Sequence, residues 1–255
     1  MCRMLGYLGR ARALSTLLDD PPHSLLVQSY KAKELEGAVV NADGWGAAWY
    51  AAEDPEPIVY RSTLPIWGDV NRTHIGRAAR STSLLAAVRS ATDPLSISAA
   101  NTQPFAHGSM TFLHNGYIRD FPSTLLRPMR EALSPETYAR VEGNTDSEHV
   151  FAALVDAVSG SLDDAIRTTT ERILSLARAA DTRALLTLIV SDGEVMVGAR
   201  TAVNGNPPSL YLREDDDGVT LASEPLDESR SWRAVPPKTL VVAARGAPLR
   251  QEELS

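Results

Sequence analysis

Apolar residues recur along the chain in two kinds of pattern. Short apolar runs bounded by Gly, Pro, Asp or Asn predict strands, over residues 2–8, 46–52, 57–61, 84–90, 110–114, 184–191, 194–200, 209–213, 219–222 and 239–243. Apolar residues three or four positions apart predict helices, over residues 13–18, 24–30, 71–80, 122–133, 147–158 and 162–179. Strands, then two long helices, then strands again indicate two sheets packed together and covered by helices.

Three segments outside these elements predict turns and a loose end. Residues 191–194, of sequence Ser-Asp-Gly-Glu, are typical of a tight turn between two strands. We interpret the acidic stretch 214–218 as the solvated tip of a hairpin. The tail after Arg245 is expected to be loosely held.

The composition limits the classes of protein to which the chain can belong. The chain has 255 residues, of which 44% are hydrophobic, so it can bury a sizeable core, and we expect a single domain over residues 1–255. The formal charge is −7 and the basic residues are scattered, so nucleic acid is not expected as a partner. No secretory signal and no apolar run of roughly 20 residues is visible. We therefore expect a cytoplasmic protein with no membrane partner.

The single cysteine, Cys2, directly follows the initiator methionine. A lone cysteine is commonly a small buried hydrophobe, and that interpretation stands beside a catalytic one. If Met1 is removed, Cys2 carries a free α-amino group, which can act directly or through a water molecule as the base for its own thiol. A single cysteine also excludes an intramolecular disulfide and a cysteine-rich metal site. Its position predicts an N-terminal nucleophile that needs no histidine partner.

A nucleophile that attacks a carbonyl group needs hydrogen-bond donors for the oxyanion that develops. The sequence His114-Asn115-Gly116 offers two, because the Asn115 side-chain amide and the Gly116 backbone N–H can point into the same space. Asn-Gly after an apolar strand is also typical of an ordinary hairpin turn. On its own this motif leaves both interpretations open.

Three further residues are candidates for holding a substrate. Arg89 ends an otherwise apolar run, where its guanidinium can pair with a structural carboxylate or bind a substrate carboxylate, with Thr92 as a hydroxyl donor beside it. Thr145 and Glu148 fit a capping box at the start of a helix. Asp146 lies between them and can bind an ammonium group.

Aromatic residues provide a weaker signal. Residues 41–46, Asn-Ala-Asp-Gly-Trp-Gly, are typical of a turn into a strand, and a rigid loop near a substrate is the functional alternative. Trp45, Trp49 and Trp67 can pack in the core or bind a cationic leaving group through cation–π contacts. We take Trp45 or Trp67 as the candidate substrate contact.

Together these residues resemble the class II glutamine amidotransferase family, the cysteine branch of the N-terminal-nucleophile hydrolases. The resemblance extends from Cys2 to about Val158, and a weaker similarity is found in residues 221–225. It implies an α+β fold, a four-layer αββα sandwich with mostly antiparallel sheets. It also implies roles for the candidate residues: Cys2 as nucleophile, Asn115 and Gly116 as the oxyanion hole, Arg89 and Thr92 on the α-carboxylate of a glutamyl group, and Asp146 on its α-amino group.

Segments 20–30, 41–49, 65–69 and 88–92 are similar, within this family, to the EgtC-type amidohydrolases of ergothioneine biosynthesis. The chain departs from its relatives at Gln103 and Asp93, where many carry histidine, so these residues affect the details of the pockets. The resemblance implies cleavage of a γ-glutamyl amide to release glutamate, from γ-glutamyl-hercynylcysteine sulfoxide, without metal, cofactor or protein partner. The alternatives are a glutaminase or amidotransferase subunit, a γ-glutamyl peptide hydrolase of the glutathione type, and an inactive γ-glutamyl-binding protein.

Overall fold

The computed structural model describes residues 2–34, 40–91 and 97–254, and within them it contains two sheets. The seven-stranded sheet has the order β11-β9-β10-β1-β4-β2-β3. Its strands are β1 (Arg3–Ala13), β2 (Trp45–Tyr50), β3 (Pro57–Ser62), β4 (Arg80–Val88), β9 (Tyr211–Asp215), β10 (Gly218–Ala222) and β11 (Arg233–Ala234). The N-terminal strand β1 therefore lies inside the sheet, between β10 and β4.

The six-stranded sheet has the order β13-β12-β8-β7-β6-β5. Its strands are β5 (Phe105–His107), β6 (Met110–Ile118), β7 (Ala184–Ser191), β8 (Val195–Val203), β12 (Thr239–Ala244) and β13 (Arg250–Glu253). All the strand pairs described in both sheets are antiparallel. Some neighbours are joined by tight hairpins, as β7–β8 and β9–β10 are, whereas β1 pairs with two strands from distant parts of the chain.

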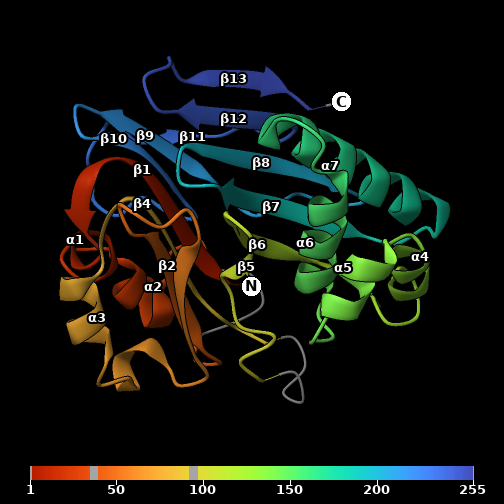
Figure 1. Ribbon diagram of the computed structural model, residues 1–255, viewed down its shortest axis with the longest axis horizontal. Coiled ribbons are helices and arrows are strands. Elements are labelled where there is room, and N and C mark those ends of the chain that lie inside the picture. The colour runs from red at the N-terminus through yellow and green to blue at the C-terminus, as the bar shows by residue number, and fades with distance from the viewer. Residues whose placement is uncertain (1, 35–39, 92–96, 255) are drawn as a thin grey trace.

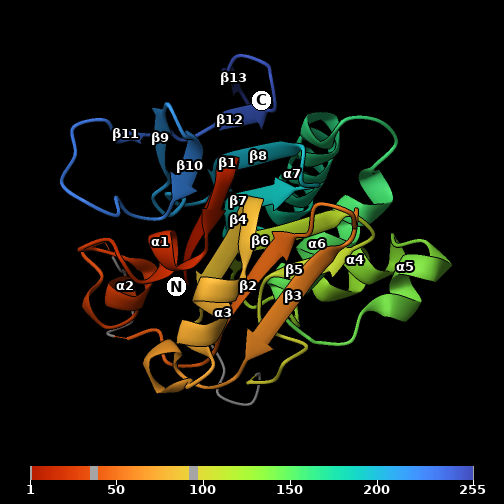
Figure 2. The same cartoon turned by 60° about the vertical axis from the view of Figure 1, so that its left-hand side comes forward.

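Helices cover the outer faces of the two sheets and complete four layers (Figures 1 and 2). The helices are α1 (Ser15–Leu18), α2 (Leu25–Lys31), α3 (Arg72–Ala78), α4 (Leu126–Glu131), α5 (Pro135–Arg140), α6 (Asp146–Ala157) and α7 (Leu162–Ala179), with a 3₁₀ turn η1 (Ile66–Gly68). The first three helices lie on the seven-stranded sheet, and α6 and α7 lie on the six-stranded sheet (Figure 1). The α+β sandwich expected from the sequence is confirmed.

Three buried clusters correspond to the three interfaces between these layers. Leu5, Trp45 and Leu84 belong to the cluster under α1–α3, and Phe112 and Ile166 belong to the cluster under α4–α7. The cluster between the sheets includes Met4, Leu85, Leu113 and Ile189. Alternate residues of one strand thus face different layers, as β-pleating requires.

The predicted loose tail and two predicted strand ends are wrong, and two turn predictions are confirmed. The tail after Arg245 is not loose, because Arg250–Glu253 forms β13 and pairs with β12. Strand β6 continues to Ile118 rather than ending at His114, and β1 continues to Ala13 rather than ending at Leu8. Residues 191–194 do form the turn between β7 and β8, and the acidic stretch 214–218 does form the tip between β9 and β10.

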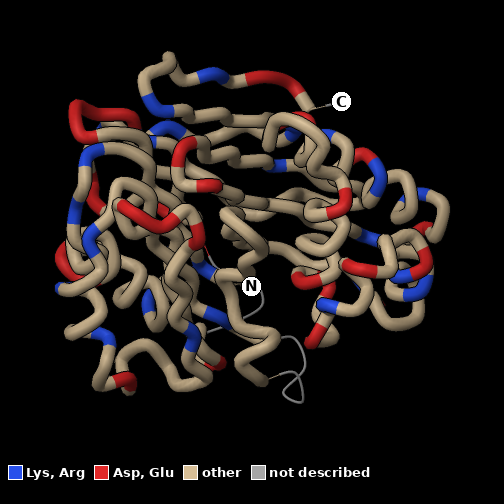
Figure 3. Tube along the Cα trace, viewed as in Figure 1, with Lys and Arg blue, Asp and Glu red and all other residues tan. Residues whose placement is uncertain are grey.

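Lys and Arg are scattered over the molecule among Asp and Glu rather than gathered into one basic stripe (Figure 3). In the described part of the chain, no helix is long and apolar enough to cross a bilayer.

Candidate active site

A pocket of about 400 Å³ lies where the two sheets meet the N-terminus of α6. Both sheets and the helix supply its lining, which consists of residues 2, 89–91, 101, 103, 116–122 and 144–147. Four of the seven predicted site residues are among them, although they are far apart in the sequence: Cys2, Arg89, Gly116 and Asp146. The pocket is thus built where five stretches of the chain come together.

Cys2 lies directly before the central strand β1 and is half-buried. Arg3 pairs with Val88 across the β1–β4 ladder, so the antiparallel register places Cys2 beside Arg89. The Arg3 side chain turns back and donates from Nε to the Cys2 carbonyl oxygen at 2.7 Å. The predicted nucleophile is therefore held at the wall of the pocket.

Asn115 lies inside β6, so the hairpin-turn interpretation of Asn115-Gly116 is wrong. Leu113 faces the interface between the sheets, and Asn115, two residues further along, shares that face. The Asn115 side chain is fully buried, yet neither its oxygen nor its nitrogen has a hydrogen-bond partner in the described part of the chain. An unpaired buried amide costs about 1–3 kcal/mol, and this cost points to a functional role.

The backbone N–H of Gly116 faces an edge of β6 that β5 does not cover. Strand β5 pairs with β6 only between Phe112 and Met110, and beyond this point other groups take its place. The Gln103 side chain bonds the N–H of His114 at 2.5 Å, and Asp146 Oδ2 bonds the N–H of Ile118 at 2.7 Å. Alternation places the Gly116 N–H between them, toward the same edge.

Only glycine fits at position 116. Its φ is +153°, in a region that side chains rarely adopt. A Cβ atom there would lie 1.9 Å from the Leu185 carbonyl oxygen and 2.7 Å from His114 Nε2. A side chain at this position would therefore prevent β6 from packing against β7.

Arg89 follows the end of β4 and is 7% exposed. The loop before β2 holds its backbone, because Arg89 N–H donates to Gly44 O at 2.8 Å and Asp43 N–H donates to Arg89 O at 3.0 Å. Burial lowers the pKa of Arg89, while the charges of Cys2, Asp43 and Asp146 oppose that shift. The rigid-loop interpretation of residues 41–46 therefore fits the structure. Thr92 lies outside the described residues.

Asp146 is the first residue of α6, and it links this helix to β6. Its Oδ2 accepts from Ile118 N–H at 2.7 Å, and its Oδ1 accepts from Ser147 N–H at 2.7 Å. Thr145 caps the helix as predicted, accepting from the N–H of Glu148. The reciprocal half of the capping box is wrong, because Glu148 accepts from the N–H groups of Glu142 and Gly143 instead.

Two residues support strand β6 in ways that the sequence pattern did not show. Gln103 is 6% exposed and bonds both backbone groups of His114, donating to its carbonyl oxygen at 2.9 Å. The buried His114 ring lies 2.9 Å from Ser147 Oγ through Nδ1 and 3.1 Å from the Leu185 carbonyl oxygen through Nε2. A carbonyl only accepts, so Nε2 carries the proton. Burial lowers the pKa of His114, which keeps the ring neutral at pH 7.

Trp45 does not fit its predicted role as a substrate contact. Its side chain is fully buried in the core under α1–α3, and its indole N–H donates to Asp69 Oδ2 at 3.0 Å. The Trp45 backbone pairs with Val88, and in this position the ring packs behind the strand rather than in the pocket. Trp67 is 45% exposed and packs edge-on against Tyr30, also outside the pocket lining.

Comparisons with known proteins agree with this geometry. A sequence profile described as "Glutamine amidotransferases class-II" matches residues 21–204. The γ-glutamyl-hercynylcysteine sulfoxide hydrolase of Mycobacterium tuberculosis (strain CDC 1551 / Oshkosh) is 35% identical to this chain, over 98% of the chain and 96% of the relative. The protein of that name from Mycolicibacterium smegmatis is 34% identical, over 94% of the chain and 95% of the relative.

A solved structure agrees with the fold. A class-II glutamine aminotransferase domain protein from Silicibacter pomeroyi superposes on the chain with a TM-score of 0.73 and 23% sequence identity, over 100% of both chains. At this level of identity the likeness supports the shared architecture alone.

Proposed function

This chain belongs to the class II glutamine amidotransferase family, and we propose that it hydrolyses a γ-glutamyl amide with Cys2 as its nucleophile. The observation that carries this proposal is the pocket, which brings Cys2 together with Gly116, Arg89 and Asp146. The proposal requires the removal of Met1, since only then does Cys2 carry a free α-amino group. We propose γ-glutamyl-hercynylcysteine sulfoxide as the substrate, because two relatives of nearly equal length carry that name.

The glutamyl group binds through its charged head. The Arg89 guanidinium holds the α-carboxylate through charge-assisted hydrogen bonds, and Thr92 is proposed to assist. Asp146 holds the α-ammonium group, since each carboxylate oxygen can accept a further hydrogen bond beside those from Ile118 and Ser147. These contacts place the γ-carbonyl carbon next to Cys2 and raise the effective concentration of the thiol.

In the first half of the reaction, the Cys2 α-amine takes the thiol proton and the sulfur attacks the γ-carbonyl carbon. The oxyanion accepts hydrogen bonds from the Asn115 side-chain amide and the Gly116 N–H. The C–N bond then breaks, and the protonated α-amine gives its proton to the leaving amine. In the second half, water attacks the thioester and gives a proton to the α-amine, the C–S bond breaks, and the amine returns the proton to the Cys2 sulfur as glutamate leaves.

Glutamate release tests the proposal. The wild-type protein, shown by intact mass to lack Met1, receives γ-glutamyl-hercynylcysteine sulfoxide, glutamine and glutathione at equal concentrations. We expect kcat/KM to be highest for the sulfoxide conjugate. Higher turnover of glutamine or glutathione would move the function to ammonia supply or γ-glutamyl peptide cleavage, and no release from any of them would favour a γ-glutamyl-binding protein.

Replacement of the nucleophile is the second test. We expect Cys2→Ala to lower kcat by about 10³-fold or more, while glutamate or substrate still binds, as isothermal calorimetry would show. A fully active Cys2→Ala protein would overturn the proposed mechanism.

Location in the cytoplasm also stays a proposal, which fractionation of the source cells would test.

A further inference from the structure

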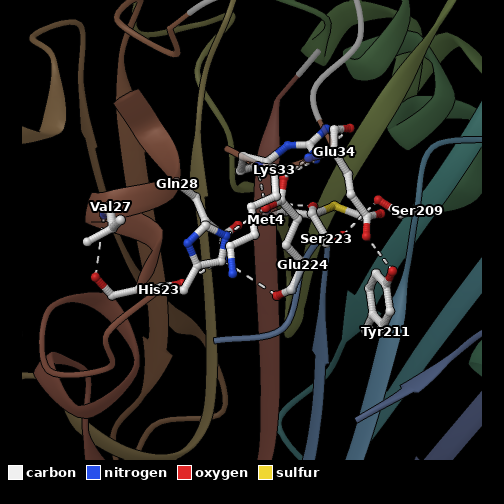
Figure 4. Close-up of polar contacts among 12 residues, drawn as sticks. Met4, His23, Val27, Gln28, Lys33, Glu34, Ser209, Tyr211, Ser223 and Glu224 are labelled. Atoms are coloured by element: carbon white, nitrogen blue, oxygen red, sulfur yellow. Dashed lines mark hydrogen bonds and ion pairs between the residues drawn. The ribbon is translucent and has the colours of Figure 1, made fainter. Parts of the chain in front are cut away.

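A buried carboxylate lies beside the start of β1, outside the pocket lining. Glu224 follows β10, where Ser223 pairs with Met4 through two hydrogen bonds of 2.9 Å, one from Met4 N–H to Ser223 Oγ and one from Ser223 N–H to Met4 O. Glu224 is 1% exposed. Figure 4 shows its carboxylate facing His23 and the backbone of Lys33 and Glu34.

The Glu224 carboxylate is fully hydrogen-bonded. Oε2 accepts from His23 Nε2 at 2.7 Å and from Lys33 N–H at 2.8 Å, and Oε1 accepts from Glu34 N–H and from Arg3 Nη1, each at 3.0 Å. Burial by itself would raise the pKa of Glu224, but these hydrogen bonds and the Arg3 charge lower it to about 2. The group is therefore a fixed negative charge at neutral pH.

Arg3 connects this charge to the nucleophile. Its side chain is fully buried, and while Nη1 binds Glu224, Nε donates to the Cys2 carbonyl oxygen at 2.7 Å. A residue at the start of a chain has covalent support on one side alone. A hydrogen bond to its carbonyl oxygen restricts rotation about the Cα–C bond of Cys2, and so sets where the thiol and the α-amine point.

We propose that Arg3 and Glu224 are positioning residues for the nucleophile: Glu224 fixes the Arg3 guanidinium, and Arg3 holds the Cys2 backbone in the orientation that attack requires. Neither side chain touches the substrate. This inference rests on the proposed function of Cys2, and it adds a requirement for catalysis that the pocket lining does not include. Misplacement of a reacting group by about 1 Å can cost 10²-fold in rate.

Arg3→Lys separates positioning from charge. Lysine keeps a positive charge for Glu224 but lacks the Nε donor that binds the Cys2 carbonyl. We expect kcat to fall by about 10- to 100-fold, with KM within about twofold. The chain has one cysteine, so iodoacetamide labelling reports on Cys2 alone, and its rate should rise because the released residue is more accessible. Opposite changes in kcat and in labelling rate are the signature of lost positioning.

A matched control is Arg167→Lys. Arg167 also pairs with a carboxylate, that of Glu252, and donates to a backbone carbonyl, that of Glu253, but it lies on α7 away from the pocket. This control should keep wild-type kcat and labelling rate. Equal kcat and labelling in Arg3→Lys and wild type would overturn the inference, as would a parallel fall of both with the folded fraction. If wild type releases no glutamate, the proposed function fails, and the labelling comparison still decides the positioning of Cys2.

Discussion

The two walls of the pocket are held in place by different kinds of interaction. On the nucleophile wall, Cys2 is tied to Arg3, and Arg3 to the buried charge of Glu224. On the oxyanion wall, neutral groups hold β6 at His114, with the Gln103 amide on its backbone and its ring on Ser147, and one carboxylate, Asp146, accepts from Ile118 N–H further along. The stabilisation that an ionised group provides changes with pH, whereas a closely packed strand is sensitive to changes in side-chain size. Substitutions in the two walls should therefore change kcat and the melting temperature in different ways.

Among the variants that keep Cys2, Asn115→Ala should have the largest effect on catalysis while leaving the oxyanion wall intact. Loss of one oxyanion donor typically lowers kcat by about 10²–10³-fold. The melting temperature should be unchanged or higher, because the substitution removes a buried amide that has no hydrogen-bond partner in the described chain. Steady-state kinetics and calorimetry of the purified variant test both halves. A kcat near that of wild type would contradict the oxyanion role.

Gly116→Ala should damage the oxyanion wall through shape. The new Cβ would meet the Leu185 carbonyl oxygen at 1.9 Å, so β6 must shift from β7, at a cost of about 1–3 kcal/mol. We expect a lower melting temperature and lower kcat together. Gly160→Ala is the control, because a Cβ there meets no atom within 4 Å. If both variants melt like wild type, the close approach does not constrain the strand.

Glu224→Gln should expose the pH sensitivity of the nucleophile wall. The pKa of Glu224 lies at about 2, below its ordinary value of 4.5, so its ionised form stabilises the folded state fully above about pH 4.5. That contribution is lost as the pH falls from 4.5 toward 2. The difference in melting temperature between wild type and Glu224→Gln should thus be largest near neutral pH and shrink below pH 4.5. A constant difference over this range would refute the ionic anchor.

Arg119→Gln should give the smallest effect, and it tests an exposed residue in the pocket lining. Arg119 is exposed, lines the pocket, and forms no ion pair with a residue in the described ranges. If it attracts the carboxylate of an amino-acid leaving group, kcat/KM for the sulfoxide conjugate should fall about two- to fivefold. Turnover of glutamine, whose leaving group is ammonia, should not change. An equal fall for both substrates would assign Arg119 to the glutamyl head instead.

Local sequence patterns predicted most of the framework. Helix α7 and strand β7 begin and end where the periodicity indicated, because a repeating apolar face must be buried. Strand β13 was missed because Arg250–Glu253 is polar and forms only by pairing with β12. Asn115-Gly116 was ambiguous for a related reason. Asn-Gly pairs favour turns, but here both residues pair with β7 and lie within a strand.

The site was predicted unevenly for the same physical reason. Cys2 could be proposed as a nucleophile from its position in the chain, and Arg89 and Asp146 could be proposed as pocket residues because charged groups at the ends of apolar elements need partners. Gln103 and Glu224 could not be assigned, since their partners, His114 and Arg3, are 11 and 221 residues away. Trp45 was misassigned because an aromatic residue beside a loop has the same local signal in a pocket as in a core.

The sequence by itself determined the alternation of strands and helices, the place of the single cysteine directly after Met1, and the kinds of group proposed to bind a glutamyl substrate. Those properties depend on side-chain chemistry and on neighbours along the chain. Only the tertiary structure decided which groups share a pocket, which tryptophan is buried and how Cys2 is held. Sheet register, burial and long-range hydrogen bonds join residues from different segments, so no local pattern encodes them.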